Sequence, residues 1–294
     1  MTTNYQILTD SSCDLPASLA RTLGVSYAPL RVQFQGAEYE NFLDGDPRSR
    51  LEMKAFYKTL RTGAPTSTTA VNPEGWSTLM APILAAGQDL LILAFSSGLS
   101  STYAAAVLAA QELAPQYPGR TIRVVDTLCA SMGQGLLVYH AVQRQQAGES
   151  LAQVADFVEA TKLHLCHWFT VDDLMFLKRG GRISAATAMV GSMLSIKPVL
   201  HVDDQGHLVN VSKARGRRAA LQALVDKMEQ TAIQPENQTV FIGHGDCLED
   251  AQWVAQEVRR RFGTKHISIA YTCPIIGTHS GPGTLALFFL ATGR

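Results

Sequence analysis

The chain has few charged residues for its length, and its charges cancel. Of 294 residues, 17% are charged, and 25 Lys and Arg residues balance 25 Asp and Glu residues, so the formal net charge is zero. A protein that holds nucleic acid through its overall field needs an excess of positive charge, so this balance argues against a nucleic-acid-binding protein. The balance does not exclude a local basic patch.

Cysteine is scarce, and its spacing is typical of neither disulfide frameworks nor zinc sites. The cysteines are odd in number, lie far apart and form no C-x-x-C pair. We interpret this pattern as that of a protein with reduced thiols in the cytoplasm. The five residues are Cys13, Cys129, Cys166, Cys247 and Cys273.

Targeting and membrane-spanning segments are also lacking. The sequence starts MTTNYQILTDSS, which leads into a strand pattern without the basic and apolar regions of a signal peptide. No apolar run approaches the roughly 18 to 20 residues that a membrane span needs, because Pro274, Gly277 and Pro282 interrupt the long uncharged region after His266. We therefore expect a globular cytoplasmic protein without a membrane span, whose 46% hydrophobic residues suffice for a substantial core.

Standard catalytic and nucleotide-binding motifs are missing too. The sequence contains no G-x-S-x-G, no G-x-x-x-x-G-K-[ST], and no G-x-G-x-x-G after a strand. His164 and His167 flank Cys166, but a strand would place the two imidazoles on opposite faces, and no acidic cluster is near. We therefore expect structural histidines here, no metal site and no cofactor.

The most informative segment that is present is residues 89–113, DLLILAFSSGLSSTYAAAVLAAQEL. Residues 90–95 form an unbroken apolar run, typical of a strand buried on both faces. A hydroxyl-rich loop follows at 96–102, and Ser100 or Ser101 is suited to cap the alanine-rich helix after it. Open α/β sheets place ligand sites at such strand ends, where the amides of a helix start favour an anion. A helix cap alone explains these serines equally well.

Strands alternate with helices through the first half, which predicts an α/β fold with a mostly parallel sheet and flanking helices. We place a boundary near Leu163, which divides the chain into an N-terminal α/β domain at 1–163 and a C-terminal α/β domain at 164–294. Further expectations concern local structure. Asp14 is expected to cap a helix that runs to residue 23, residues 63–73 and 277–283 to form loops, 197–211 to form a hairpin, and 184–194 and 284–291 to form helices.

Small, hydroxyl-rich loops recur along the chain, at residues 11–12, 66–69, 96–102 and 278–280. Hydroxyl groups donate hydrogen bonds to a carboxylate without being charged, so they suit an anionic head group at the mouth of an apolar cavity. His279 adds a candidate charge-assisted donor. The alternatives are ordinary turn chemistry for the loops and a buried, satisfied imidazole for His279.

Six stretches, taken in order, resemble the DegV family, which includes the fatty-acid-binding subunits of bacterial fatty acid kinase. The resemblance covers nearly the whole chain. It implies two α/β domains that enclose a long apolar tunnel for one fatty acid, with the carboxylate held at the domain junction. The stretches are DSSCDLP at 10–16, STTAVNP at 67–73, SSGLSST at 96–102, LKRGGRI at 177–183, IKP at 196–198 and GTHSGPG at 277–283.

The resemblance also implies which residues meet the head group. Thr68 and Ser97 are implied to bind the carboxylate, with Thr69 and Ser96 beside them. His279, in the Gly-Thr-His motif of the family, is implied to lie close to it.

The same resemblance implies roles for two arginines. Arg182 is implied to lie near the mouth, and Arg215 to occupy a basic position where a kinase partner docks. The alternatives are a surface salt bridge for Arg182 and a solvated charge at a helix start for Arg215. The sequence departs from the family at Ser101, where glycine is usual, and at residues 69–71, where Thr-Ala-Val replaces Ser-Gln-Pro; these departures bear on the loop width and the set of donors.

Burial of an acyl chain favours such a carrier. At about 0.8 kcal/mol per buried methylene, roughly fourteen methylenes contribute about 11 kcal/mol before ordering costs. Two or three hydroxyl donors and an imidazole would offset the cost of burying the carboxylate. The helices expected at 184–194 and 284–291 are our candidates for tunnel walls, and ordinary core packing is the alternative.

The leading hypothesis is therefore a non-enzymatic carrier. It binds a long-chain fatty acid and presents the carboxylate to an ATP-dependent fatty acid kinase, which makes an acyl phosphate for phospholipid synthesis. A second hypothesis is a serine hydrolase that uses Ser97 and His279 with an acid such as Asp126. A third is a sensor of another anionic lipid.

Overall fold

The structure is a computed structural model that describes residues 4–184 and 196–294. The helix expected at 184–194 lies outside the described residues except for its first one. Among the residues that are described, no helix combines the length and the apolar character needed to cross a membrane.

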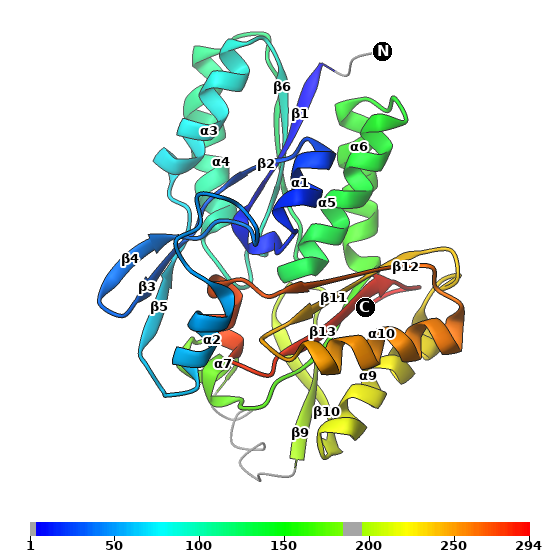
Figure 1. The fold of residues 1–294 in the computed structure, drawn as a ribbon. Helices are drawn as coiled ribbons and strands as arrows, with labels where there is room; N and C mark the ends of the chain where they lie inside the picture. Colours follow the sequence, from blue (N-terminus) through cyan, green and yellow to red (C-terminus); the bar gives the residue numbers. More distant parts are fainter. Residues whose placement is uncertain (1–3, 185–195) are drawn as a thin grey trace.

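A four-stranded parallel sheet organises the first half of the chain (Figure 1). Alternate residues of its strand β6 face opposite helical layers, because successive side chains of a strand point to opposite faces. Leu91 and Leu93 pack with α1, α5 and α6, whereas Leu90 and Ile92 pack with α3 and α4. The expected parallel sheet with flanking helices is thus confirmed. The strand order is β2 (Ser26–Ala28), β1 (Tyr5–Asp10), β6 (Asp89–Ala94), β7 (Ile122–Asp126), and the helices are α1 (Ala17–Leu23), α3 (Pro73–Ala85), α4 (Thr102–Leu113), α5 (Ser131–Gln146) and α6 (Leu151–Thr161).

A small antiparallel sheet projects from this half beside α2 (Met53–Leu60) (Figure 1). Its order is β4 (Ala37–Glu40), β3 (Arg31–Phe34), β5 (Thr66–Thr69). We expected a loop at 63–73, which is wrong for residues 66–69. These hydroxyl-bearing residues pair with β3 and so form strand β5. Threonine is branched at Cβ and suits a strand as well as a turn.

The second half forms a six-stranded mixed sheet, with α9 (Arg217–Thr231) and α10 (Leu248–Phe262) packed on one face. Helix α5 packs on the other face and so lies between the two large sheets. The hairpin expected at 197–211 is confirmed. The order of the sheet is β10 (Leu208–Arg215), β9 (Ile196–Val202), β8 (Leu165–Thr170), β13 (Leu285–Leu290), β11 (Thr239–His244), β12 (His266–Tyr271).

Two expectations for the last segments were wrong. Instead of the helix expected at 284–291, residues 285–290 form strand β13, with β8 and β11 on its two sides. A short apolar run fits a buried helix and a buried strand equally well, so periodicity could not distinguish them. Part of the expected loop at 277–283 belongs to helix α11 (Pro274–Ser280), which begins with a proline at its first position.

Asp14 is not the cap of α1, which has Pro16 at the capping position. The Asp14 backbone is left-handed, with φ of 54°, and its side chain is buried between the halves. Its carboxylate accepts hydrogen bonds from the Ser131 hydroxyl and, at 3.0 Å, from the Cys273 amide. Asp14 therefore joins the first half to the starts of α5 and α11.

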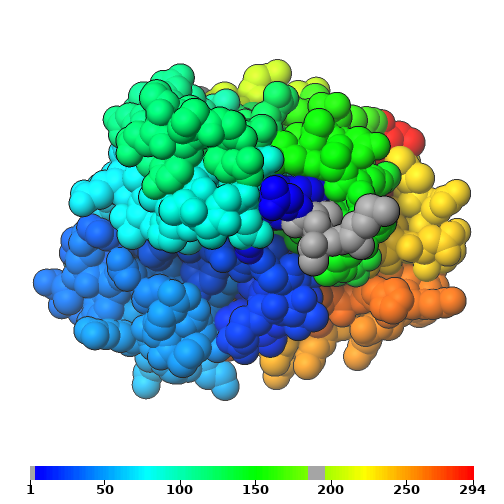
Figure 2. Space-filling model, turned by 90° about the horizontal axis from the view of Figure 1, so that it is seen from above, coloured from blue at the N-terminus to red at the C-terminus, as the bar shows by residue number. Residues whose placement is uncertain are grey.

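The strands of the parallel sheet all precede residue 127, and those of the six-stranded sheet all follow residue 164. The division into domains at residue 163 stays a prediction. Seen from above, the first half covers most of the surface, and the second half appears along one side (Figure 2).

Candidate functional site

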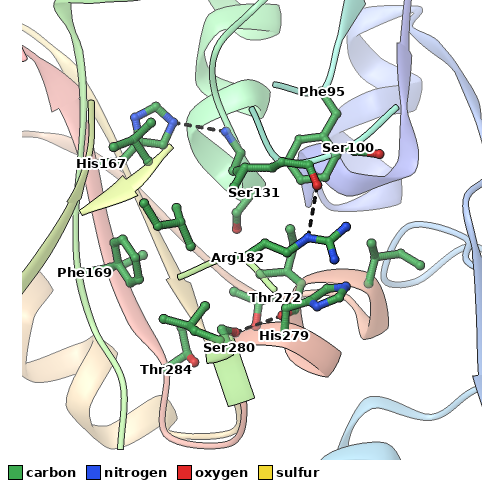
Figure 3. Close-up of a pocket in the computed structure, with 18 of the residues that line it drawn as sticks. Phe95, Ser100, Ser131, His167, Phe169, Arg182, Thr272, His279, Ser280 and Thr284 are labelled. Atoms are coloured by element: carbon green, nitrogen blue, oxygen red, sulfur yellow. Dashed lines mark hydrogen bonds between the residues drawn. The ribbon is translucent and has the colours of Figure 1, made fainter. Parts of the chain in front are cut away.

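A cavity of about 250 Å³ lies where the two halves meet (Figure 3). Strand β13 supplies one wall through Ala286 and Phe288, and Thr284, just before the strand, continues the same alternation of side chains. The segment expected to line a tunnel thus lines this cavity, although as a strand. Other apolar lining residues include Leu30, Phe95, Leu99, Phe169, Leu177 and Ile276.

Most hydroxyl groups in the wall are already bonded to the protein. Ser280 Oγ donates to the carbonyl of Ile276 at 3.0 Å, and Thr284 Oγ1 donates to that of Gly281 at 2.8 Å. Ser131 Oγ donates to Asp14. Because these donors are used internally, much of the wall offers an apolar surface to a ligand.

The polar end of the cavity is formed by Thr68, Arg182 and His279, which come from β5, the turn after α7 (Met175–Arg179), and α11. A hydrogen bond of 2.8 Å joins Thr68 Oγ1 to His279 Nε2. Arg182 Nε donates to the carbonyl of Leu99 at 3.1 Å, and Nη1 donates to that of Gly180. The same three residues also line an outer cleft of about 390 Å³, so they separate the cavity from this cleft.

The positive charge at this end belongs to Arg182. Its guanidinium is half-buried, which lowers its pKa, but an arginine stays protonated at neutral pH. It forms no ion pair with a described residue, which argues against the salt bridge considered from the sequence. A half-buried cation with no anionic partner favours the binding of an anion.

The His279 imidazole is neutral at pH 7, not the charged donor expected. Burial, and secondarily the charge of Arg182, lower the pKa of His279 to about 4. Its Nδ1 atom is buried without a hydrogen-bond partner among the described residues. In this structure the imidazole is therefore a neutral donor or acceptor.

The structure does not bring Ser96, Ser97 or Thr69 to the cavity. Ser97 is exposed, and its amide donates to Asp126 Oδ1 at 3.1 Å. Ser96 is buried, and its hydroxyl donates to the carbonyl of Gly206 at 2.9 Å. Thr69 is exposed on β5, where the alternation of the strand turns it away from Thr68.

Ser100 and Ser101, from the same loop, do line the cavity, although within this loop only Ser96 and Ser97 were assigned to the carboxylate. The amides of Leu99 and Ser100 both donate to the Ser96 carbonyl, so the chain turns tightly here. Which serines of the turn face inward depends on this geometry. Ser100 also accepts from the Thr102 amide at 3.2 Å, whereas Ser101, at the capping position of α4, makes no side-chain capping bond.

The serine hydrolase arrangement is not assembled. Among the described residues, no hydrogen bond joins Ser97 to His279, whose Nε2 is bonded to Thr68. Asp126 contacts Ser97 only through the backbone amide. A nucleophile needs a positioned base, and Ser97 has none within the part of the chain that the structure describes.

The remaining candidates lie elsewhere. Arg215 is exposed at the end of β10 and does not line the cavity. His167 lines the cavity, with Nδ1 bonded to the Leu165 carbonyl at 3.0 Å and Nε2 accepting from the Ala130 amide at 3.2 Å, a structural role. In the described part of the chain, no three His, Cys, Asp or Glu side chains are grouped to hold a metal ion.

Gly180 holds the imidazole in place. A Cβ atom added to Gly180 would overlap His279 Nδ1, although the φ of −74° at Gly180 suits any residue. We expect Gly180→Ala to displace the imidazole and to weaken the binding of a ligand in the cavity about tenfold. Overpacking should also lower the free energy of unfolding by about 1 to 3 kcal/mol. Calorimetric titration and urea unfolding would measure the two effects.

Gly293→Ala is the matched control for Gly180→Ala, because its added methyl group meets nothing within 4 Å. In a His279→Ala background, Gly180→Ala should cost little, since the clashing ring is gone. A full cost in that background would contradict the assigned contact.

The fold and the site define an α/β protein whose apolar cavity ends at a cation that has no ion-pair partner among the described residues. The chain belongs to the DegV family, because the family model described as "Uncharacterised protein, DegV family" matches residues 4–292. A DegV domain-containing protein from Clostridium perfringens is 44% identical over 286 residues, which are 97% of each chain.

Solved structures of the family share the fold. A DegV family protein from Thermus thermophilus, whose structure is described as showing fatty acid binding, has a TM-score of 0.86 and 30% identity over 98% of this chain and 100% of that one. A DegV lipid binding protein from Thermotoga maritima has a TM-score of 0.84 and 27% identity, covering 99% and 100% of the two chains. The expected DegV-like fold is confirmed.

Proposed function

We propose that this protein binds a long-chain fatty acid in the cavity, with the carboxylate at Arg182, His279 and Thr68. The observation that carries the proposal is the half-buried Arg182 guanidinium, which has no ion-pair partner among the described residues and lies at one end of a largely apolar cavity. The relatives described as binding fatty acids or lipid support the same conclusion.

Thr68 and His279 offer the carboxylate a donor in one of the two tautomers of the imidazole. If the Thr68 hydroxyl donates to Nε2, the neutral imidazole carries its proton on Nδ1, which has no partner among the described residues. If Nε2 donates to Thr68, the hydroxyl is free to donate to the ligand. Nδ1 is buried against Gly180, so only the second tautomer supplies a neutral donor to the ligand beside the Arg182 cation.

The proposal includes a partner. The chain has no phosphate loop or other nucleotide-binding motif, so a separate ATP-dependent kinase would phosphorylate the bound acid for phospholipid synthesis in the cytoplasm. The outer cleft beside the carboxylate gives that kinase a route to the head group. Arg215, exposed on the edge strand β10, is the proposed docking residue. The protein itself then acts as a carrier, not an enzyme.

Native mass spectrometry of the purified protein tests the binding function. We expect one long-chain acid per chain, or uptake of one added palmitate or oleate molecule. A panel of other anionic lipids, measured in parallel, distinguishes a sensor of a different lipid. A protein that stays empty in the presence of both acids would overturn the proposal.

The Thr68 hydroxyl is expected to contribute a modest part of the affinity. Thr68→Val keeps the shape of the side chain and removes the hydroxyl, so it should weaken palmitate binding about 2- to 12-fold, the value of a neutral hydrogen bond. Thr69→Val is the matched control on the same strand, because Thr69 is exposed and does not line the cavity. Equal effects of the two substitutions in a binding titration would contradict the role of Thr68.

A further inference from the structure

The tip of the hairpin between β9 and β10 reaches from the second half of the chain to a turn in the first half. We call residues 203–207 the hairpin tip and residues 96–101 the serine turn. The buried Ser96 hydroxyl of the turn donates to the carbonyl of Gly206 in the tip at 2.9 Å. Residues of the turn and residues that flank the tip line the cavity, namely Leu99, Ser100, Ser101, Val202 and Leu208.

Two glycines allow this close contact. A Cβ atom added to Gly98 would lie 2.9 Å from the carbonyl oxygens of Gln205 and Gly206, which are backbone atoms and cannot rotate away. The backbone of Gly98 is not left-handed, so the lack of space, and not its conformation, requires glycine there. A Cβ atom added to Gly206 would overlap Ser96 Oγ. The serine turn and the hairpin tip thus pack backbone against backbone.

Hydrogen bonds within the hairpin tip hold its backbone in place. The Asp203 side chain accepts from the amides of Gln205 and His207, at 3.0 and 2.8 Å. The Gly206 amide donates to the Asp203 carbonyl at 2.9 Å. The part of the tip that Gly98 contacts is therefore a fixed support for the serine turn.

The serine turn holds Arg182. The amides of Leu99 and Ser100 both donate to the Ser96 carbonyl at 3.1 Å, so the turn sets the direction of the Leu99 carbonyl. Arg182 Nε donates to this carbonyl at 3.1 Å. One backbone carbonyl therefore connects the contact between turn and tip to the guanidinium at the polar end of the cavity.

We propose that Gly98 is a positioning residue, which seats the serine turn on the hairpin tip and so orients the Arg182 guanidinium toward the carboxylate of the bound acid. This inference rests on the proposed function. A long, flexible side chain binds a charged group better when it is oriented before the ligand arrives. A displaced turn would leave the cavity apolar and release the guanidinium, so it should affect a charged head group more than the tail.

Titration of Gly98→Ala with palmitate and with hexadecanol tests this role. We expect palmitate binding to weaken about tenfold, and binding of hexadecanol, which has no negative charge, to weaken less than twofold. Gly293→Ala is the matched control, because its added methyl group meets no described atom within 4 Å. Equal losses for the two ligands would overturn the inference, since the turn would then act through packing alone.

A double-mutant cycle separates positioning of Arg182 from a general effect on structure. In an Arg182→Met background, Gly98→Ala should no longer weaken palmitate binding, because residues that act through one contact are not additive. An undiminished tenfold loss in that background would overturn the role of Gly98. If Gly98→Ala does not fold, Ser96→Ala takes its place in the cycle, since it removes the hydroxyl bond to the tip without adding volume, and its expected loss is about threefold.

The Arg182 side chain also gives a readout without ligand. Its Nε proton is bonded to the Leu99 carbonyl, so hydrogen exchange at Nε, measured by NMR, should be about tenfold faster in Gly98→Ala than in wild type. An unchanged exchange rate in a protein that binds palmitate would overturn this inference and leave the proposed function standing. Wild-type protein that binds neither palmitate nor hexadecanol would overturn both.

Discussion

Replacing Arg182 by methionine is expected to weaken fatty acid binding about 10- to 100-fold, because a hydrogen bond to a charged group contributes about 1.5 to 3 kcal/mol. Methionine keeps the unbranched apolar stem and removes the charge. Arg182 is half-buried, donates to the carbonyls of Leu99 and Gly180, and has no carboxylate partner among the described residues. A fatty acid carboxylate would be that partner.

The Arg182 prediction has an internal control in the ligand. Hexadecanol has the same kind of tail as palmitate and no negative charge, so Arg182→Met should leave its binding nearly unchanged. Arg182→Lys, which restores the charge without the planar fork, should recover part of the loss for palmitate. Equal losses for palmitate and hexadecanol in calorimetric titrations would mean that Arg182 acts through packing, and the head group would then lie elsewhere.

Asp14→Asn is expected to change how stability depends on pH. Asp14 is fully enclosed at the starts of α5 and α11, and no cation is among the groups that shift its titration. Burial, with a smaller contribution from the charge of Asp10, raises the pKa of Asp14 to about 7, against hydrogen bonds from Ser131 and Cys273 that lower it. Asparagine can keep both contacts, since its oxygen accepts from the Cys273 amide and its amide group donates to Ser131.

The sign of the effect follows from the raised pKa. An acid whose pKa is higher in the folded protein holds its proton there while the unfolded chain loses it, so Asp14 lowers the free energy of unfolding as the pH rises from about 4 to about 7. A difference of about three pKa units corresponds to about 4 kcal/mol. Asp14→Asn removes this loss, so its stability relative to wild type should grow by up to that amount across the window.

Urea unfolding of both proteins at pH 4.5, 6 and 7.5 would measure this difference. Buried histidines act in the opposite direction, because the lowered pKa values of residues such as His201 and His244, about 4, favour the folded state as the pH rises. They are present in both proteins and cancel when the two are compared. A difference between the proteins that does not vary with pH would contradict the assigned titration of Asp14.

Local patterns predicted much of the first half of the fold. The apolar run at 90–95 is followed by a loop with glycine and by an alanine-rich helix, so the type of β6 followed from the sequence and its position to within one residue, at 89–94. Residues 284–291 gave no such signal. Their apolar side chains suit either structure, and only pairing with β8 and β11 makes them a strand.

The site depended on contacts between distant parts of the chain. Thr68 and His279 are 211 residues apart, and their meeting was implied only by resemblance to the family. Asp14 looked like a helix cap because its partners, 117 and 259 residues away, leave no local pattern. In the loop at 96–102, the side chains that face the cavity are set by a tight turn, so Ser97 was preferred over Ser100 and Ser101.

A crystal structure of the protein grown with oleate tests the central proposal most directly. We expect electron density for an acyl chain between β13 and the loop before α4, with its carboxylate within hydrogen-bond distance of Arg182 and of Thr68 or His279. An acyl chain bound outside this cavity, or one whose carboxylate lies at the opposite end near His167 and Phe169, would contradict it.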